Sequence, residues 1–534
     1  MDGGRLVPLG DWSLTTVPER DDLLGKGTEK PCSRREAMKS RKTVSLWMCI
    51  LALCLTDVAA KKNLIYPDYL PTEIGQYTPG PAIDIHKNLS DQEWPQLGNT
   101  PQRTNFSPMK FDPPQGRLKW VAFLTDFDID NKIAPVAQVI VAEGLCFIGT
   151  KNGRMFALDA KSGEVKWTFQ AGGPILHTAG CASGRLLFLC MDGKAYALNA
   201  RDGTPLWTFD SRRRHGFSTA ILLAEDKAFA VDRGGRLFAL DAASGAELWH
   251  YDAGAPVDHS PAWNAGKVFF ASEDLRVHAV NAADGSRAWR TEPLGGMSFR
   301  WTHPVVVSER VFVEAMGLGK HLEDFRDPAR RVFFALDEKT GKELPPLPRW
   351  LMGHDGPQPP PAVTRDGKLV VQWSCPDFMK MTIHNSYLGW AVQDPDSGQI
   401  LMPLIEDKPG PMQSHGEDYL MYYGTCAADE NLIASVLGDL ALVIHHQGFR
   451  QGPTPFMTGA FDFKTRRWSV KGGKGSKGDG WHYHSQPPNH QCGGSNAVSG
   501  AGGLLYHADG QSNRIVCHEP EPLESATSQR QGGE

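Results

Sequence analysis

Residues 157–167 read Ala-Leu-Asp-Ala-Lys-Ser-Gly-Glu-Val-Lys-Trp, and the same pattern recurs in three further copies downstream. Each copy keeps an Asp or Asn, then a Gly, then a Trp at constant spacing. Measured at the Asp or Asn, the copies lie 40, 42 and 40 residues apart. A fixed period of this length is typical of propellers and other repeat proteins. The shared positions are Asp159, Gly163 and Trp167, then Asn199, Gly203 and Trp207, then Asp241, Gly245 and Trp249, then Asn281, Gly285 and Trp289.

Each repeat predicts a small antiparallel sheet. The Asp159 side chain can bond the backbone of a turn, and Gly163 tolerates positive φ. The strand after that turn carries Trp167, whose ring can pack between neighbouring repeats. Upstream in the next copy, the apolar stretch 186–189 passes through a tight hairpin at 191–194 into another strand. Four strands per repeat are the content of one propeller blade.

Later repeats are looser and are recognised at 335–341, 390–398, 461–468 and 503–517. The last repeat lacks its outer strand, which Lys119 and Trp120 are expected to supply, closing the ring. The chain is therefore predicted to be all-β: an eight-bladed β-propeller of four-stranded antiparallel blades, with long loops on one face. Seven blades is the alternative count.

The repeat resembles a known family. Its pattern, Ala-x-Asp/Asn-x-x-x-Gly-x-x-x-Trp, is similar to the tryptophan-docking repeat of dehydrogenases that use pyrroloquinoline quinone (PQQ). Cofactor-free relatives, such as the propeller lipoprotein of outer-membrane barrel assembly, look alike. Residues 94–98 and 103–105 resemble the segment that leads into such propellers, so the resemblance covers roughly 94–520. It implies PQQ with Ca²⁺ as a cofactor of some members, but the adjacent cysteine pair of the alcohol dehydrogenases is absent here.

The first 60 residues predict export. Basic residues at 39–42 precede an apolar run at 44–55 and small residues at 58–60, the order of a secretory signal. Residues 1–37 are interpreted as an upstream over-extension, 61–93 as an extended N-terminal segment and 521–534 as a disordered tail. The apolar run is too short for a comfortable membrane span, so the mature chain is expected to have none. The resemblance places the protein in the bacterial periplasm or cell envelope.

Two other export routes stay open. Ser33-Arg34-Arg35 begins a degenerate twin-arginine signal, and Cys54 ends a weak lipoprotein box.

The net charge of −5 gives no basic surplus for nucleic-acid binding. Seven cysteines follow residue 60, an odd number, so at least one thiol is unpaired in a monomer.

Long insertions predict where ligands bind. Residues 316–331 and 374–388 interrupt hairpins, and 345–361, 402–417 and 471–493 lengthen connections between blades. In a four-stranded blade these connections emerge on one face, so we expect them to form a collar around the channel. Arg212–His215 add a positive patch between the second and third blades, available to an anionic ligand or simply solvated.

Histidines gather toward that face. Neutral imidazole suits copper, zinc or iron, so convergence around the axis would build a transition-metal site. Ordinary hydrogen bonding is the competing interpretation, because no tight ligand spacing is present. The candidate ligands are His177, His259, His303, His482, His484 and His490.

These observations leave three functional hypotheses. The first is an exported, monomeric propeller that binds a protein or small-molecule ligand through its loop-rich face. The second is a periplasmic oxidoreductase using PQQ or a histidine-bound metal at the channel mouth. The third is a scaffold in envelope assembly. No catalytic residue can be assigned from the residues, and fold alone does not decide among the three.

Overall fold

The computed structural model describes residues 77–520, except for 112–116, 125–132, 135, 317–332, 346–359, 375–386, 405–421, 424–434, 447–455, 469–481, 484–496 and 510–512. The leader expected at 1–60, the tail expected at 521–534 and nearly all of the predicted collar lie outside the described residues. Those assignments therefore stay predictions.

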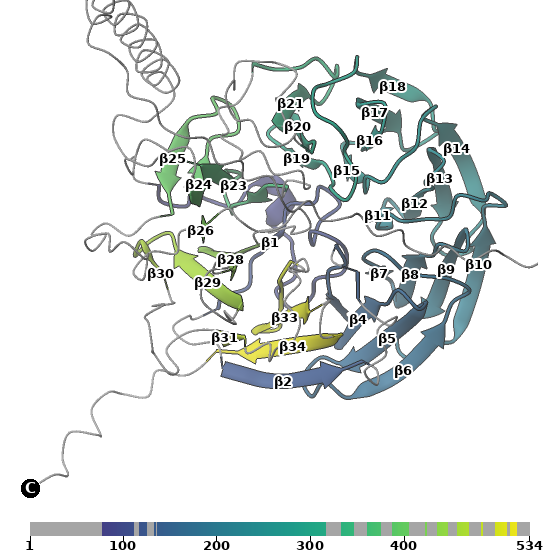
Figure 1. The fold of residues 1–534 in the computed structure, drawn as a ribbon, viewed down its shortest axis with the longest axis horizontal. Helices are drawn as coiled ribbons and strands as arrows, with labels where there is room; N and C mark the ends of the chain where they lie inside the picture. The colour runs from purple at the N-terminus through teal and green to yellow at the C-terminus, as the bar shows by residue number, and fades with distance from the viewer. Residues whose placement is uncertain are drawn as a thin grey trace, which may run out of the picture. The chain divides into compact units, whose positions relative to one another are not determined.

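Eight small sheets stand around one axis, which confirms the eight-bladed propeller (Figure 1). Within a blade, consecutive strands pair antiparallel from the axis outward. Blades 1 and 2 are β3 (Ile140–Ala142), β4 (Leu145–Gly149), β5 (Arg154–Asp159), β6 (Val165–Gln170), and β7 (Gly180–Ala182), β8 (Arg185–Leu189), β9 (Lys194–Asn199), β10 (Pro205–Asp210). Blades 3 and 4 are β11 (Leu222–Ala224), β12 (Lys227–Val231), β13 (Arg236–Asp241), β14 (Glu247–Asp252), and β15 (Ala262–Asn264), β16 (Lys267–Ser272), β17 (Arg276–Asn281), β18 (Arg287–Arg290).

The later blades depart slightly from this plan. Among the described residues, blade 5 has three strands, with an isolated bridge between Leu336 and Glu343 on its outer side. Blades 6 and 7 each carry an extra short strand, β26 (Tyr422–Tyr423) and β31 (His482–Tyr483). The main strands are β19 (Val305–Val307), β20 (Arg310–Glu314), β21 (Phe333–Asp337); β22 (Ala362–Val363), β23 (Leu369–Ser374), β24 (Tyr387–Gln393), β25 (Ile400–Pro403); and β27 (Ser435–Leu437), β28 (Leu440–His446), β29 (Phe456–Asp462), β30 (Arg467–Trp468).

Blade 8 closes the ring with a strand from the other end of the chain. It consists of β32 (Ser499–Ala501), β33 (Leu504–Asp509) and β34 (Arg514–Glu519), and its outer strand is β2 (Arg117–Phe123). Trp120 lies opposite Cys517 in this antiparallel pair. The predicted closure by Lys119 and Trp120 is therefore confirmed.

Tryptophan docking joins successive blades. Five outer-strand tryptophans each lie against the turn glycine of the next blade, and the indole N–H of each donates to a backbone carbonyl in that turn, at 3.0 Å from Trp167 to Ala200. The glycine is needed because its φ is positive and a Cβ would meet the indole at 2.5–2.6 Å. The pairs are Trp120–Gly163, Trp167–Gly203, Trp207–Gly245, Trp249–Gly285 and Trp289–Gly341.

Residues 91–107, here called the sealing segment, bond the inner strands of all eight blades. An open inner strand would leave unpaired backbone groups at the channel, and the segment satisfies one N–H in or directly after each such strand. It ends in β1 (Phe106–Ser107), parallel to β27, and follows the 3₁₀ turn η1 (Asp84–His86). The pairs, written segment acceptor then N–H donor, are Trp94–Val141, Pro95–Cys181, Gln96 side chain–Leu223, Pro101–Trp263, Gln102–Val306, Thr104–Val363, Asn105–Val436 and Asp91–Gly502.

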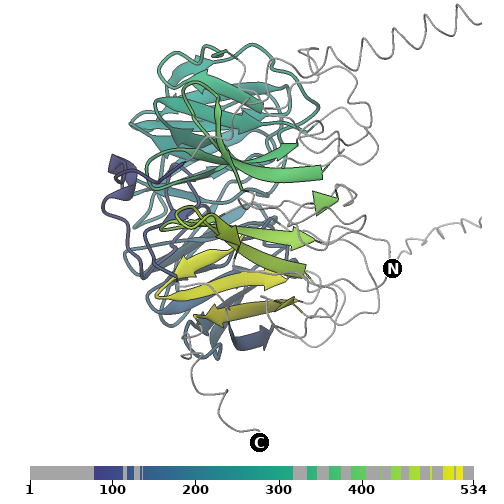
Figure 2. The same ribbon diagram turned by 90° about the vertical axis from the view of Figure 1, so that its left-hand side faces the viewer.

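The sealing segment lies on one face of the ring, drawn in purple (Figure 2). It contacts turns that join the first and second strands of blades; in one of them the Gly438 N–H donates to Ser107 O at 2.8 Å. The face opposite carries the hairpins between second and third strands. Among the described residues, no helix has the length and apolar character needed to cross a bilayer.

Candidate binding site at the channel mouth

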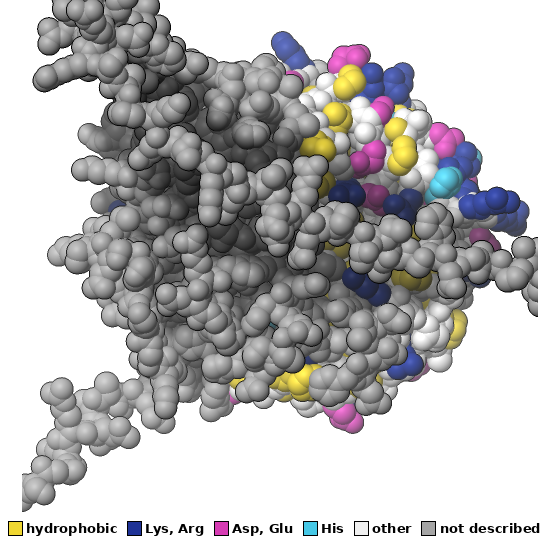
Figure 3. All heavy atoms as spheres, viewed as in Figure 1, with side chains coloured by type: hydrophobic (Ala, Val, Ile, Leu, Met, Phe, Trp, Pro, Cys, Tyr) yellow, Lys and Arg dark blue, Asp and Glu magenta, His cyan; other side chains and the backbone are white. Residues whose placement is uncertain are grey.

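The face opposite the sealing segment is described most fully in blades 1 to 4 and in the connection from blade 4 to blade 5. Charged side chains of both signs mix there with apolar ones over the blades of β11–β18 (Figure 3). We give the name channel mouth to the following residues of blades 3 to 5 and of the connections that lead into these blades: Arg213, Ser218, Asp232, Arg233, Asp258, Glu273, Ser298, Arg300 and Trp301. Hairpin tips and blade connections bring them together, which is why no sequence motif marks the group.

Two arginine–carboxylate pairs form one side of the mouth. Arg213, from the β10–β11 connection, pairs with Asp232, whose side chain is fully buried. Arg233 donates to Asp258 from Nε at 3.0 Å and from Nη2 at 3.4 Å, and Ser218 also donates to Asp258. The positive patch predicted at Arg212–His215 is thus partly neutralised, because Arg213 is held by a carboxylate.

Glu273 forms the other side, at the tip of the β16–β17 hairpin. Its Oε2 accepts a hydrogen bond from Ser298 Oγ at 2.6 Å, while its buried Oε1 has no partner among the described residues. Burial raises the pKa of Glu273, and the nearby Asp258 carboxylate raises it further, against the lowering effect of Ser298. This carboxyl can therefore take up a proton more readily than an exposed glutamate.

Trp301 gives the mouth an exposed aromatic face. The residue is 38% exposed, its φ is +65°, and its backbone N–H donates to Asp258 O at 2.8 Å. A left-handed backbone is unusual for so bulky a residue, and such strain concentrates at functional sites. The Arg300 guanidinium lies 4.7 Å from the Trp301 ring centroid, in a cation–π contact. Together they offer stacking and positive charge to a partner.

The predicted metal-binding histidines are only partly described. His177, His259 and His303 precede the inner strands of blades 2, 4 and 5, and all three are buried. The backbone of His482 lies in β31 but its side chain is not described, and His484 and His490 lie outside the described residues. Within the described ranges, no three His, Cys, Asp or Glu side chains form a group that could hold a metal ion. The metal site stays a prediction.

Sequence reasoning missed Glu273 and Trp301. Neither residue belongs to a recognisable motif. Glu273 stands in a hairpin and Trp301 in a loop, and at such positions both residue types have many roles. The one available signal was that Trp301 stands just before the inner strand of blade 5, in the loop where ligands of propellers are expected.

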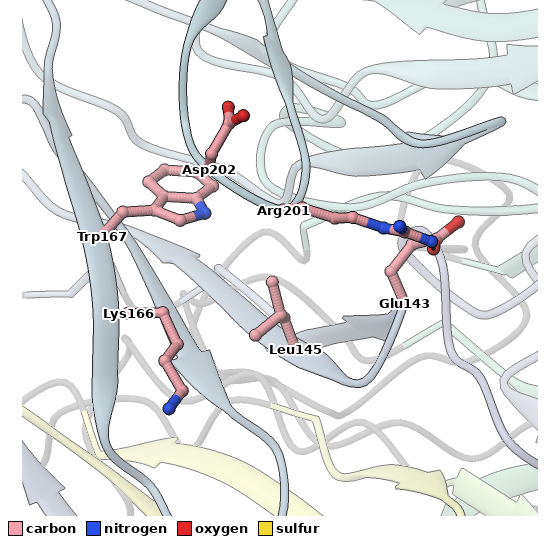
Figure 4. A pocket seen from close by; sticks show the side chains of 6 residues that line it. All are labelled: Glu143, Leu145, Lys166, Trp167, Arg201 and Asp202. Atoms are coloured by element: carbon pink, nitrogen blue, oxygen red, sulfur yellow. Dashed lines mark hydrogen bonds and ion pairs between the residues drawn. The ribbon is translucent and has the colours of Figure 1, made fainter.

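A shallow groove opens between blades 1 and 2, with a volume of about 580 Å³ (Figure 4). Its residues already have structural roles. The Trp167 indole docks on blade 2, and Arg201 Nη2 lies 3.4 Å from Glu143 Oε2. We assign it to the packing of the repeat. It is lined by Glu143, Leu145, Lys166, Trp167, Arg201 and Asp202.

Comparison with known proteins gives one matching family and many similar folds. The family model described as "Outer membrane protein assembly factor BamB" matches residues 109–224, 191–344 and 234–374. No curated protein matches. A europium-containing methanol dehydrogenase is similar with a TM-score of 0.52 and 12% identity, over 80% of this chain and 90% of that one.

Two further solved structures are similar. The quinohemoprotein alcohol dehydrogenase ADHIIG from Pseudomonas putida HK5 has a TM-score of 0.52 and 14% identity, over 84% of each chain. BamB from Moraxella catarrhalis has a TM-score of 0.45 and 15% identity, over 76% of this chain and 99% of that one. At these identities the dehydrogenases show a shared propeller fold and nothing about activity.

Proposed function

We propose that this chain, which belongs to the family of PQQ-repeat β-propellers, is an exported binding module. Its channel mouth would hold a protein or small-molecule partner. Export rests on the leader pattern at residues 39–60, and a protein partner is consistent with the assembly factor for which the matching family is described. The mouth is charged with both signs, so the partner would not be a nucleic acid.

Trp301 is the observation that carries this proposal. A bulky residue with a left-handed backbone, partly exposed and stacked against an arginine, is an arrangement that is concentrated at functional sites. Aromatic and arginine side chains dominate the energetics of protein interfaces. The arginine-paired Asp232 and Asp258 around it would hold the mouth in one arrangement before the partner arrives.

Site-specific cross-linking tests the proposal. A photo-reactive amino acid would replace Trp301 in the full chain, expressed in its native host, and adducts would be identified by mass spectrometry. The control places the same group at Leu206, which is 48% exposed on the outer strand β10. We expect one dominant adduct at position 301 that is absent at 206. Equal or absent labelling at both positions would overturn the proposal.

An oxidoreductase using PQQ is the second candidate, favoured by the fold shared with two dehydrogenases. The described residues do not fit a PQQ–calcium site. Ca²⁺ takes six to eight oxygen ligands, whereas Asp232 and Asp258 already hold arginines and Glu273 offers one unpartnered oxygen. The predicted collar, where ligands were expected to bind, lies almost entirely outside the described residues. Titration of the full chain with PQQ and Ca²⁺ therefore decides whether the protein binds this cofactor. A stoichiometric change in the absorption spectrum would place the enzyme hypothesis first.

A further inference from the structure

Arg103 is a buried cation without an acidic partner. Its side chain is fully buried in the sealing segment, and no carboxylate among the described residues pairs with it. It donates from Nε to Pro261 O at 2.9 Å, from Nη1 to Leu97 O at 2.7 Å and from Nη2 to Ile221 O at 3.1 Å. Burial lowers its pKa to about 9, which still leaves it charged at neutral pH. These carbonyls solvate the guanidinium but supply no negative charge.

His259 presents an N–H that no described group accepts. Its Nδ1 accepts a hydrogen bond from the Ala271 N–H at 3.0 Å, so in the neutral ring the proton is on Nε2. That Nε2 is buried without a partner among the described residues. A metal would need a lone pair at Nε2, and this tautomer has none there.

His303 adds a second unpartnered nitrogen. Its Nδ1 lies 3.3 Å from Pro304 O, to which it can donate, and its buried Nε2 has no partner among the described residues. His177 differs, because its Nδ1 accepts from the Thr178 N–H at 2.9 Å and its Nε2 lies 3.2 Å from Ser260 Oγ. Its ring nitrogens are therefore occupied.

Hydrogen bonds connect the chain segments that carry Arg103, His259 and His303. Ser260, which follows His259, donates its N–H to Thr302 O at 3.0 Å, and Thr302 precedes His303. The residue after Ser260 is Pro261, the acceptor of Arg103 Nε. The groups also interact electrostatically. Burial is the main cause of the lowered pKa of His259, and His303 lowers it further. Burial is likewise the main cause of the lowered pKa of His303, and Arg103 lowers it further.

We propose that Arg103, His259 and His303 form an internal site for a small monovalent anion on the channel axis. The anion would balance Arg103 and accept the Nε2–H of His259. His303 would contribute a second N–H by exchanging its tautomer, so that Nε2 carries the proton. A water molecule could satisfy the imidazoles but would leave the guanidinium charge without compensation. A transition-metal ion would be repelled by Arg103 and would meet a donor at His259.

Halide dependence of stability tests the site. The full chain would be unfolded by urea in sodium chloride and in sodium gluconate at equal ionic strength. Gluconate carries the same charge as chloride but is too large for a buried site that holds a small anion. Above the dissociation constant, each tenfold increase in chloride should raise the folding equilibrium constant up to tenfold, with no such increase in gluconate. Identical unfolding in the two salts at every concentration would overturn the proposal.

Two variants and one diffraction measurement keep the test sharp. His259→Leu should abolish the chloride dependence, whereas the control His278→Leu, at another buried histidine whose ring nitrogens bond Tyr251 and Ser272, should retain it. If His259→Leu does not fold, crystals of the unaltered protein grown in sodium bromide provide the second readout. An anomalous peak beside Arg103 supports the site, and ordered water without a peak refutes it. Neither result depends on the partner at the mouth.

Discussion

Replacing Gly203 by Ala tests whether the docking of tryptophans between blades requires a residue without a side chain. Gly203 has a φ of +73°, and a Cβ there would lie 2.6 Å from Cδ2 of Trp167. Left-handed backbone costs a non-glycine residue about 1–2 kcal/mol, and overpacking adds about 1–3 kcal/mol. We expect Gly203→Ala to lower the free energy of unfolding by about 2–5 kcal/mol. Urea unfolding followed by tryptophan fluorescence measures this value.

Gly184 in the same blade is the matched control. Its φ is +71°, nearly that of Gly203, but no atom lies within 4 Å of a Cβ placed there. Gly184→Ala should therefore lose only the backbone contribution, about 1–2 kcal/mol. The difference between the two variants isolates the contact with Trp167. Equal losses, at an unchanged dependence on urea, would refute the idea that this contact excludes a Cβ.

Three further predictions concern buried groups. Burial lowers the pKa of His177 to about 3 and of His278 to about 4. Because the same histidines in the unfolded chain take up a proton near pH 6.5, lowering the pH from 7.5 to 5 should reduce the free energy of unfolding by about 2 kcal/mol per histidine. Urea midpoints that are the same at pH 7.5 and pH 5 would contradict this. Burial raises the pKa of the Cys146 and Cys517 thiols, so iodoacetamide should label their peptides in urea but not in the native protein, as mass spectrometry can show. Gly98 has a φ of +67°, and a Cβ there would lie 2.8 Å from Cα of Arg103. Gly98→Ala should therefore lower the free energy of unfolding, measured in urea, by at least about 2 kcal/mol.

The repeat made most of the architecture predictable. One residue triplet, such as Asn199, Gly203 and Trp207, marks a turn, a close approach and a docking ring, so its period counts the blades. Closure by β2 was predictable for a similar reason, because the last repeat lacked a strand and Trp120 stood free upstream. These inferences succeed since each repeat must bury the same faces against its neighbours.

The candidate site was less predictable, because it depends on residues outside the repeat. His259 was recognised as an axial histidine, but its proton position follows from one backbone N–H, that of Ala271. Trp301 has a left-handed backbone that its sequence context does not indicate. The sealing segment resembled a propeller's leading segment, yet its bonds to all eight blades could be found only in three dimensions.

Closure by β2 restricts how such a protein can evolve. A duplicated repeat added at either terminus would separate β2 from β34, or leave the new sheet outside the ring. New blades must therefore arise by duplication inside the chain, where the flanking tryptophan and glycine can accept another copy. The sealing segment would then have to lengthen by one acceptor, so its length and the number of repeats would have to change together.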